Sequence, residues 1–186
     1  MTKTPMSGLV ERASQEGLLD VAYTTTDSPF GPLLLARTPK GLVRVGLPNQ
    51  DAEELLAELA TRVSPRVLEA PGQFDEARRE LDLYFEGRLE SFDLALDWQL
   101  SEGFRRRVLR GIARIPYGQT RSYTQMARGA GNQRAVRAAG TACGSNPIPL
   151  VVACHRVLRS SGGMGGYGGG VPMKRALLEL EGALDV

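Results

Sequence analysis

Asn146-Pro-Ile-Pro-Leu-Val-Val-Ala-Cys154-His155-Arg156-Val157 is the run that decides how this chain is interpreted, because it holds the only histidine and one of the two cysteines. A cysteine attacks as its thiolate, and a neighbouring imidazole or positive charge favours that form. Here an imidazole and a guanidinium follow the sulfur within two residues. The proline-bracketed apolar run predicts a short buried strand that delivers Cys154 to a loop. By itself the run leaves two interpretations open, a nucleophilic cysteine or a small core residue.

The composition is that of a globular protein. The 186 residues are 42% hydrophobic and 24% charged, which suits one large domain or two small ones. Two cysteines are too few for a disulfide framework, and there is neither a signal segment nor an apolar stretch near the ~18 residues that span a bilayer. We therefore expect a cytoplasmic protein without membrane contact. One histidine and two cysteines cannot supply a usual four-ligand zinc site, so no metal is expected.

Charge is divided unevenly along the chain, although the net charge is only +2. Residues 1–100 carry 10 Lys and Arg against 17 Asp and Glu, whereas residues 101–186 carry 13 against 4. So basic a second half favours a polyanionic partner, because neutralised phosphates release counterions. The alternative is a solvated basic face. The change of sign near residue 100 favours two domains, of which the second meets nucleic acid.

The first half predicts antiparallel strands followed by helices. β-branched and apolar segments separated by Pro and Gly turns indicate strands, and leucines at helical spacing indicate helices. The expected strands cover 21–26, 33–36 and 42–45, the expected helices cover 51–63 and 74–85, and an acidic connector covers 91–100. We place the domain boundary in this connector, between residues 97 and 98.

The second half predicts short helices over 104–115, 122–128, 133–143 and 173–180. The second and third are joined by a glycine-containing turn, and the third carries small residues and arginines, which is typical of a helix-turn-helix. A glycine-rich stretch, 162–170, lacks the strand-to-helix placement of a phosphate-binding loop. It is either a flexible linker or a lid that closes on a flat ligand with Tyr167 as its anchor.

With these residues in view, the chain resembles the O6-alkylguanine-DNA alkyltransferases, repair proteins that take an alkyl group onto their own cysteine. The resemblance covers nearly all of residues 104–182 and is looser over the first half. It is carried by Phe104-Arg-Arg-Arg-Val108, Ile115-Pro-Tyr-Gly-Gln-Thr-Arg-Ser-Tyr123, Arg134-Ala-Val-Arg137-Ala-Ala-Gly140, the run from Asn146 to Val157, Gly166-Tyr167-Gly-Gly169 and Lys174-Arg-Ala-Leu-Leu-Glu-Leu-Glu181-Gly182. It implies an α+β protein, with a ribonuclease H-like strand and helix domain in residues 1–97 and a helical winged helix-turn-helix domain in residues 98–186.

The resemblance implies irreversible, single-turnover transfer from O6-alkylguanine, and from O4-alkylthymine, to Cys154. His155 takes the thiol proton through a water, and Glu181 orients the imidazole as in a catalytic triad. Asn146 ties the recognition helix to the cysteine segment. Tyr123 crowds the phosphate of the flipped nucleotide and donates a proton toward the leaving base. No cofactor is implied.

The resemblance also implies double-stranded DNA as the partner, bound through the minor groove with the damaged base flipped out of the stack. Arg137 fills the gap that the base leaves, and Tyr123, Thr124, Asn132 and Ser160 contact the DNA. Val157, Tyr167 and Gly168 line the lesion pocket. The protein is expected to be a monomer that can cluster on DNA, and to associate with the nucleoid if it is prokaryotic.

Two departures from the family and three alternatives remain. The family usually has proline where this chain has Ala153, and methionine or asparagine where it has Cys143. The alternatives are a protein that flips damaged bases without reacting, a transcription regulator that senses alkylation, and a cysteine hydrolase. The first usually replaces the cysteine, the second needs a further domain, and adjacency of Cys and His is weak evidence for the third.

Overall fold

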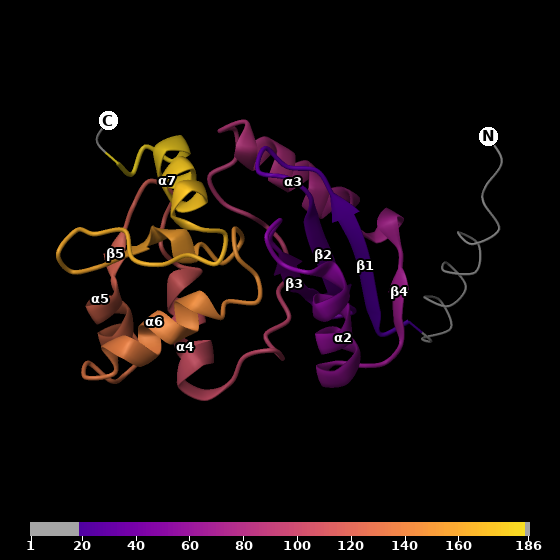
Figure 1. The fold of residues 1–186 in the computed structure, drawn as a ribbon, viewed down its shortest axis with the longest axis horizontal. Helices are drawn as coiled ribbons and strands as arrows, with labels where there is room; N and C mark the ends of the chain where they lie inside the picture. Colours follow the sequence, from indigo (N-terminus) through magenta and orange to yellow (C-terminus); the bar gives the residue numbers. More distant parts are fainter. Residues whose placement is uncertain (1–18, 185–186) are drawn as a thin grey trace. The chain divides into compact units, whose positions relative to one another are not determined.

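The computed structural model describes residues 19–184, which form two compact units (Figure 1). Of the described residues, the first unit holds 19–81 and 94–100, and the second holds 82–93 and 101–184. The first is built on a sheet and the second mostly on short helices, so the predicted α+β class is confirmed. Within residues 19–184 no helix is both long and apolar enough to cross a bilayer.

The first unit is a four-stranded sheet with the strand order β3-β2-β1-β4. Its strands are β1 (Val21–Thr26), β2 (Leu33–Thr38), β3 (Gly41–Gly46) and β4 (Val67–Glu69). β1 and β2, and β2 and β3, pair antiparallel, as the turn-separated apolar segments predict, whereas β4 runs parallel to β1. Helix α2 (Ala52–Arg62) is capped by Asp51, whose carboxylate accepts from the Glu54 N–H at 3.0 Å. The core of this unit contains Val21, Leu34, Ala36, Val43, Leu59 and Leu100.

Helix α3 (Asp75–Phe85) follows a 3-10 turn, η1 (Pro71–Gln73), and passes from the first unit into the second after Leu81. It ends at Phe85, and the φ of 69° at Gly87, two residues later, lets the closing turn form. The Gly87 N–H donates to the Tyr84 carbonyl at 3.0 Å. Tyr84, near this end, is fully buried and belongs to the second unit.

The second unit packs helix α4 against α5 and α6. Its elements are α4 (Gly103–Ile112), β5 (Arg121–Ser122), α5 (Tyr123–Gly129), α6 (Val136–Gly144), the 3-10 turn η2 (Cys154–Arg156), β6 (Val157–Leu158) and α7 (Val171–Leu180). α5 opens with a capping box, in which Ser122 and Gln125 exchange backbone and side-chain bonds. β5 and β6 form a short parallel ladder. α6 begins at Val136 rather than near Gln133, because residues 132–135 close a turn in which the Ala135 N–H donates to the Asn132 carbonyl at 3.0 Å.

The predicted strand before Cys154 is wrong, since the segment is buried but turned. Pro147 and Pro149 have no N–H to offer a ladder. The Val152 N–H instead donates to the Ile148 carbonyl at 2.9 Å, and Leu150 takes a left-handed φ of 72°. This tight turn leads into η2 at Cys154.

Candidate functional site

Asn146 holds the turn before the cysteine in shape. Its amide nitrogen donates to the Val152 carbonyl at 2.7 Å and to Cys154 Sγ at 3.1 Å, and its Oδ1 accepts from the Ile148 N–H at 3.1 Å. One side chain therefore fixes both ends of the turn and donates to the sulfur. Asn146 was predicted to tie the recognition helix to the cysteine segment; its side-chain contacts run to the turn and to the sulfur, and the role stays a prediction.

Ala153 leads into Cys154 with φ −71°. Proline fixes φ near −65°. The alanine therefore keeps the backbone angle that the family's usual proline would impose.

The Cys154 thiol is buried in η2. Burial raises its pKa, while the hydrogen bond from Asn146 and the charge of Lys174 act in the opposite direction. Sequence reasoning expected the guanidinium of Arg156 to assist the thiolate. In the structure this guanidinium turns to Glu181 and to the Ile115 carbonyl, so that expectation is wrong and the nearby cation is Lys174.

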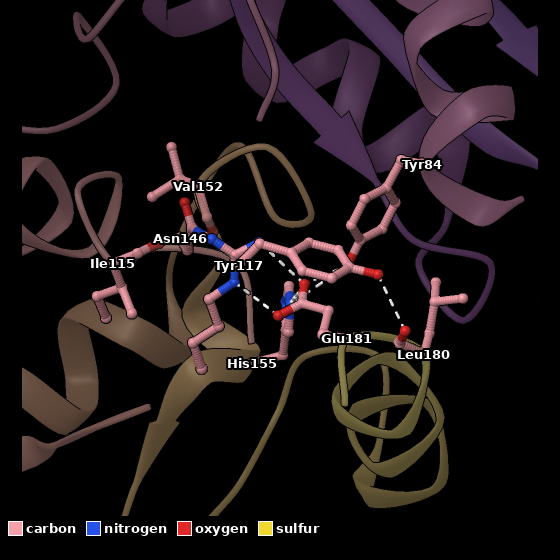
Figure 2. A network of polar contacts seen from close by, with 9 residues as sticks. Tyr84, Ile115, Tyr117, Asn146, Val152, His155, Leu180 and Glu181 are labelled. Carbon is pink, nitrogen blue, oxygen red and sulfur yellow. Dashed lines mark hydrogen bonds and ion pairs between the residues drawn. The ribbon is translucent and has the colours of Figure 1, made fainter. Parts of the chain in front are cut away.

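His155 and Glu181 form a buried pair, as predicted (Figure 2). His155 Nε2 lies 2.8 Å from Glu181 Oε1. An ionised carboxylate only accepts hydrogen bonds, so this contact places the proton of neutral His155 on Nε2. His155 Nδ1 is buried and has no hydrogen-bond partner in residues 19–184, which leaves its lone pair free to accept a proton. Burial lowers the pKa of His155, although Glu181 opposes the change.

Glu181 is the centre of the polar network in Figure 2. Besides His155, it accepts from Tyr84 Oη at 2.7 Å and from two nitrogens of Arg156 at 2.8 and 2.9 Å. Burial alone would raise the pKa of Glu181, but the bonds from His155, Arg156 and Tyr84 outweigh it and lower the pKa to about 2. The carboxylate is therefore charged throughout the physiological range and holds the imidazole in one orientation.

Two residues of this site, Tyr84 and Lys174, carried no predicted role, and a third, Arg156, has partners other than the expected thiolate. Arg156 donates to the Ile115 carbonyl at 2.6 Å, and its guanidinium lies over the ring of Tyr117. Lys174 is fully buried and donates to the Val157 carbonyl at 2.6 Å. Tyr84 fits the apolar face of its helix, so no local pattern indicated a polar partner for its hydroxyl. A lysine and an arginine inside motif segments were the only signals available.

The predicted DNA-contact residues lie in three places. Tyr123 and Thr124 begin α5, and Thr124 Oγ1 is 3.0 Å from Ser160 Oγ, so the structure brings these two predicted positions together. Asn132 is exposed in the turn before α6, and Arg137 is exposed in the first turn of α6. Burial raises the pKa of Tyr123, which keeps its phenol protonated.

Some of the arginines in the second half of the chain hold its helices together by hydrogen bonds to backbone carbonyls. Three neighbouring arginines of α4 donate to backbone carbonyls. Arg105 donates to Ser145, Arg106 to Ser101 at 2.6 Å, and Arg107 to Ala130 at 2.9 Å. These carbonyls lie at the ends of neighbouring segments, so the side chains fasten α4 to them. Net charge alone therefore overstates the number of arginines free to meet a polyanion.

The glycine-rich stretch packs on the site and is not a linker. A Cβ at Gly165 would stand 2.7 Å from Tyr123 Oη, so only glycine lets the backbone pass there. The Tyr167 ring meets the His155 ring edge-on at 6.2 Å between centroids. Val157, another predicted pocket residue, is fully buried, and Gly168 follows Tyr167 in the same loop.

Residues 19–184 contain no group of three or more His, Cys, Asp or Glu side chains placed to hold a metal. The two cysteines are both free thiols. Burial raises the pKa of Cys143 to about 12, so this second thiol stays protonated near neutral pH. The arrangement of Cys154, His155 and Glu181 is compatible with nucleophilic attack by the thiol, with the imidazole placed to act as a base.

Removing the amide of Asn146 is expected to destabilise the turn and to raise the pKa of the Cys154 thiol. Asn146→Ala leaves the Val152 carbonyl and the Ile148 N–H without their partner, which costs about 1–3 kcal/mol of unfolding free energy. It also removes the donor to Cys154 Sγ, so the thiol becomes harder to ionise. Thermal melts together with the pH dependence of thiol alkylation measure the two effects. An unchanged melting temperature would contradict the first, and an unchanged thiol titration the second.

Two family models cover most of the chain. Residues 21–98 match the model described as 6-O-methylguanine DNA methyltransferase, ribonuclease-like domain. Residues 103–183 match the model described as 6-O-methylguanine DNA methyltransferase, DNA binding domain. The two matches agree with the predicted order of a ribonuclease-like part before a DNA-binding part.

Relatives and solved structures give the same family. A Mycobacterium tuberculosis protein named methylated-DNA–protein-cysteine methyltransferase is 44% identical over 161 residues, 87% of this chain and 92% of the relative. A Methanosarcina barkeri protein of the same name is 39% identical over 159 residues, 86% of this chain and 96% of the relative. The crystal structure of Mycobacterium tuberculosis OGT in complex with DNA is 42% identical, with a TM-score of 0.75 over 87% of this chain and 93% of that chain.

Proposed function

The chain belongs to the 6-O-methylguanine DNA methyltransferase family and is a methyltransferase of alkylated DNA, and from this premise we propose that it repairs O6-alkylguanine by single-turnover transfer to Cys154. O4-alkylthymine is the second proposed substrate. The two domains proposed for this activity are residues 1–97 and 98–186. The observation that carries the proposal is the buried Cys154 beside a His155 whose Nε2 contacts Glu181 and whose Nδ1 has no hydrogen-bond partner in the described part of the chain.

The proposed step is an in-line displacement at the alkyl carbon. A bond forms between Cys154 Sγ and the alkyl carbon while the bond from that carbon to guanine O6 breaks. The thiol proton passes through a water to His155 Nδ1, and the leaving guanine receives a proton from the Tyr123 phenol. His155 then releases its proton to solvent, and solvent restores the proton of the phenol. Because the thioether has no thiol left, the protein reacts once.

The proposed encounter with DNA explains why the acceptor can be buried. A base inside the stack cannot reach the Cys154 thiol, so the damaged nucleotide is flipped outward into the pocket of Val157, Tyr167 and Gly168. The family relative whose structure contains DNA supports DNA as the partner. We propose that a monomer binds the minor groove through α5, α6 and the Thr124 and Ser160 pair, and that several copies can cluster on one duplex.

A labelled substrate tests this function directly. Incubation with a duplex that carries a radiolabelled O6-methylguanine should leave one label per protein molecule and restore guanine in the DNA. Release of the label with repeated turnover would identify a hydrolase. Binding without transfer would identify a damage sensor.

Arg137 is expected to govern base flipping more than the chemical step. It is exposed on α6, next to small residues that allow close approach to a duplex. Arg137→Ala should therefore slow repair of double-stranded lesions at least tenfold while the reaction with free O6-benzylguanine changes by less than about twofold, since each tenfold is about 1.4 kcal/mol. Single-turnover rates on the two substrates measure this. Equal losses on both would mean that Arg137 supports the pocket instead.

A further inference from the structure

We propose that Tyr84 of helix α3 is a positioning residue of the transfer reaction, whose hydroxyl sets how strongly Glu181 holds His155. The inference rests on the proposed function, because it assigns a role within the His155 and Glu181 relay. It goes beyond that function by drawing the relay's third member from residues 21–98, the ribonuclease-like part of the family match.

The Tyr84 hydroxyl bonds to the same carboxylate oxygen of Glu181 that contacts His155. Tyr84 Oη donates to Glu181 Oε1 at 2.7 Å, and the same oxygen lies 2.8 Å from His155 Nε2. Tyr84 Oη is also 3.4 Å from His155 Nε2. The phenol, the carboxylate and the imidazole therefore form one compact triangle, drawn in Figure 2. All three side chains are buried, so water does not weaken their mutual influence.

Burial keeps the Tyr84 phenol protonated, so the phenol donates the hydrogen bond and Glu181 accepts it. Burial raises the pKa of Tyr84 far above its usual value, and the charge of Glu181 raises it further. The phenol is thus a permanent donor to the carboxylate. The Tyr84 ring is held tilted against Phe85 and Phe92, at 5.5 and 5.2 Å between centroids, so the hydroxyl has little freedom to leave Glu181.

The groups facing His155 from the surrounding elements decide how it responds to a change at Tyr84. They are Glu181 after α7, Arg156 and Cys154 in η2, Lys174 in α7, Tyr84 in α3, and Tyr167 in the glycine-rich loop. Glu181 is the only anion among them that favours a protonated imidazole, whereas Arg156 and Lys174 oppose it. A change in the number of hydrogen bonds that Glu181 accepts from other donors therefore changes the pKa of His155.

Without the phenol, Glu181 keeps its charge but has one donor fewer. It then becomes a stronger acceptor for His155, and the protonated imidazole becomes easier to form. The base in the proposed relay is neutral His155, so protonation removes it. Tyr84→Phe should consequently move the acidic limb of the rate profile to higher pH by about one unit, which is a roughly tenfold loss at the acidic end. Above about pH 8, where the imidazole of His155 is neutral in both proteins, the rate should remain within about twofold of the wild type.

Tyr117→Phe is the matched control. Tyr117 also stands beside Arg156, but its hydroxyl donates to the Leu180 carbonyl at 2.9 Å and so leaves Glu181 fully engaged. Its loss should reduce the melting temperature without moving the pH profile. If Tyr84 contributed only to packing, Tyr84→Phe would likewise lower the melting temperature and leave the pH profile unchanged.

The test follows single-turnover reaction with O6-benzylguanine from pH 5.5 to 9.5 in the wild type, Tyr84→Phe and Tyr117→Phe. The ratio of variant to wild-type rate should fall about tenfold toward acid only for Tyr84→Phe. A flat ratio would overturn the proposal. Because His155 is the only histidine, its ¹⁵N resonances can be followed in the same pH series and should show a higher pKa in Tyr84→Phe alone.

The nitrogen resonances also separate this inference from the proposed function. If the wild type transfers nothing to Cys154, the function fails, yet the shift of the His155 titration still decides whether Tyr84 acts on His155. If Tyr84→Phe does not fold, 3-fluorotyrosine at position 84 keeps the ring and makes a stronger donor. The titration should then move to lower pH, and no movement would count against the proposal.

Discussion

Cys154→Ser is expected to abolish alkyl transfer while DNA binding stays within a few-fold of the wild type. A serine hydroxyl ionises far less readily than a thiol, and the Asn146 amide and Lys174 cannot compensate for that difference. DNA affinity is set mainly by the basic residues and changes little when a buried side chain is replaced by one of similar size. Transfer of label from DNA to protein, and binding to an undamaged duplex, measure the two quantities.

Cys143→Ser provides the matched control, because it removes the second buried thiol. Its pKa of about 12 keeps Cys143 protonated, and its helix offers no adjacent base. This variant should retain near wild-type transfer. Mass spectrometry of the reacted wild type should place the alkyl group on the peptide with Cys154. An alkyl group found on Cys143 would refute the assignment of the acceptor.

Glu181→Gln is expected to lower both the stability and the rate, the latter more at pH 6.5 than at pH 9. One amide oxygen cannot accept from His155, Arg156 and Tyr84 together, and the amide N–H₂ faces a donor. Breaking a buried charged partnership of this kind costs about 3–5 kcal/mol. The rate loss shrinks at pH 9 because the higher hydroxide concentration then takes over part of the thiol deprotonation that His155 otherwise performs.

Glu179→Gln is the control for Glu181→Gln, since Glu179 is exposed and its contact with Arg175 is long, at 4.0 Å. Chemical denaturation should show less than about 0.5 kcal/mol of change for it. For Glu181→Gln, a folded protein with the same fractional loss of rate at both pH values would contradict the relay. Glu181 would then serve structure only.

The lowered pKa of Glu181 also predicts how wild-type stability depends on pH. The carboxyl has a pKa of about 2 when folded and 4.5 as its ordinary value. Its stabilising contribution is complete above about pH 4.5 and is lost as the pH falls toward 2. Denaturation curves between pH 6 and pH 2 should show this loss, amounting to about 3 kcal/mol at most, and Glu181→Gln should lack that part of it.

Local signals in the sequence were sufficient for most elements, and the family resemblance supplied the central residues of the site. Ser122 and Asp51 cap the helices that they were expected to start, and His155 and Glu181 meet as the family resemblance implied. The prediction of a strand before Cys154 failed because the apolar composition of that segment fits a buried turn as well as a strand. Only the paired prolines and the Asn146 amide distinguish the two.

Tyr84 and Lys174 escaped sequence reasoning for a different reason. Each is polar at one atom and apolar along the rest, so each fits the apolar side of its helix. Their polar partners, Glu181 and the Val157 carbonyl, are 97 and 17 residues away in the chain. Such pairs depend on tertiary packing, which no local pattern contains.

Helix α3 begins in one compact unit and ends in the other, so the point at which a chimera of this chain is joined decides which parent supplies Tyr84. A crossover between residues 97 and 98 would join Cys154, His155 and Glu181 from one parent to Tyr84 from another. A crossover near η1, ahead of the helix, would let the tyrosine be inherited with its carboxylate. Chimeras made at the second position should retain the pH profile of the parent that supplies α3 and all that follows.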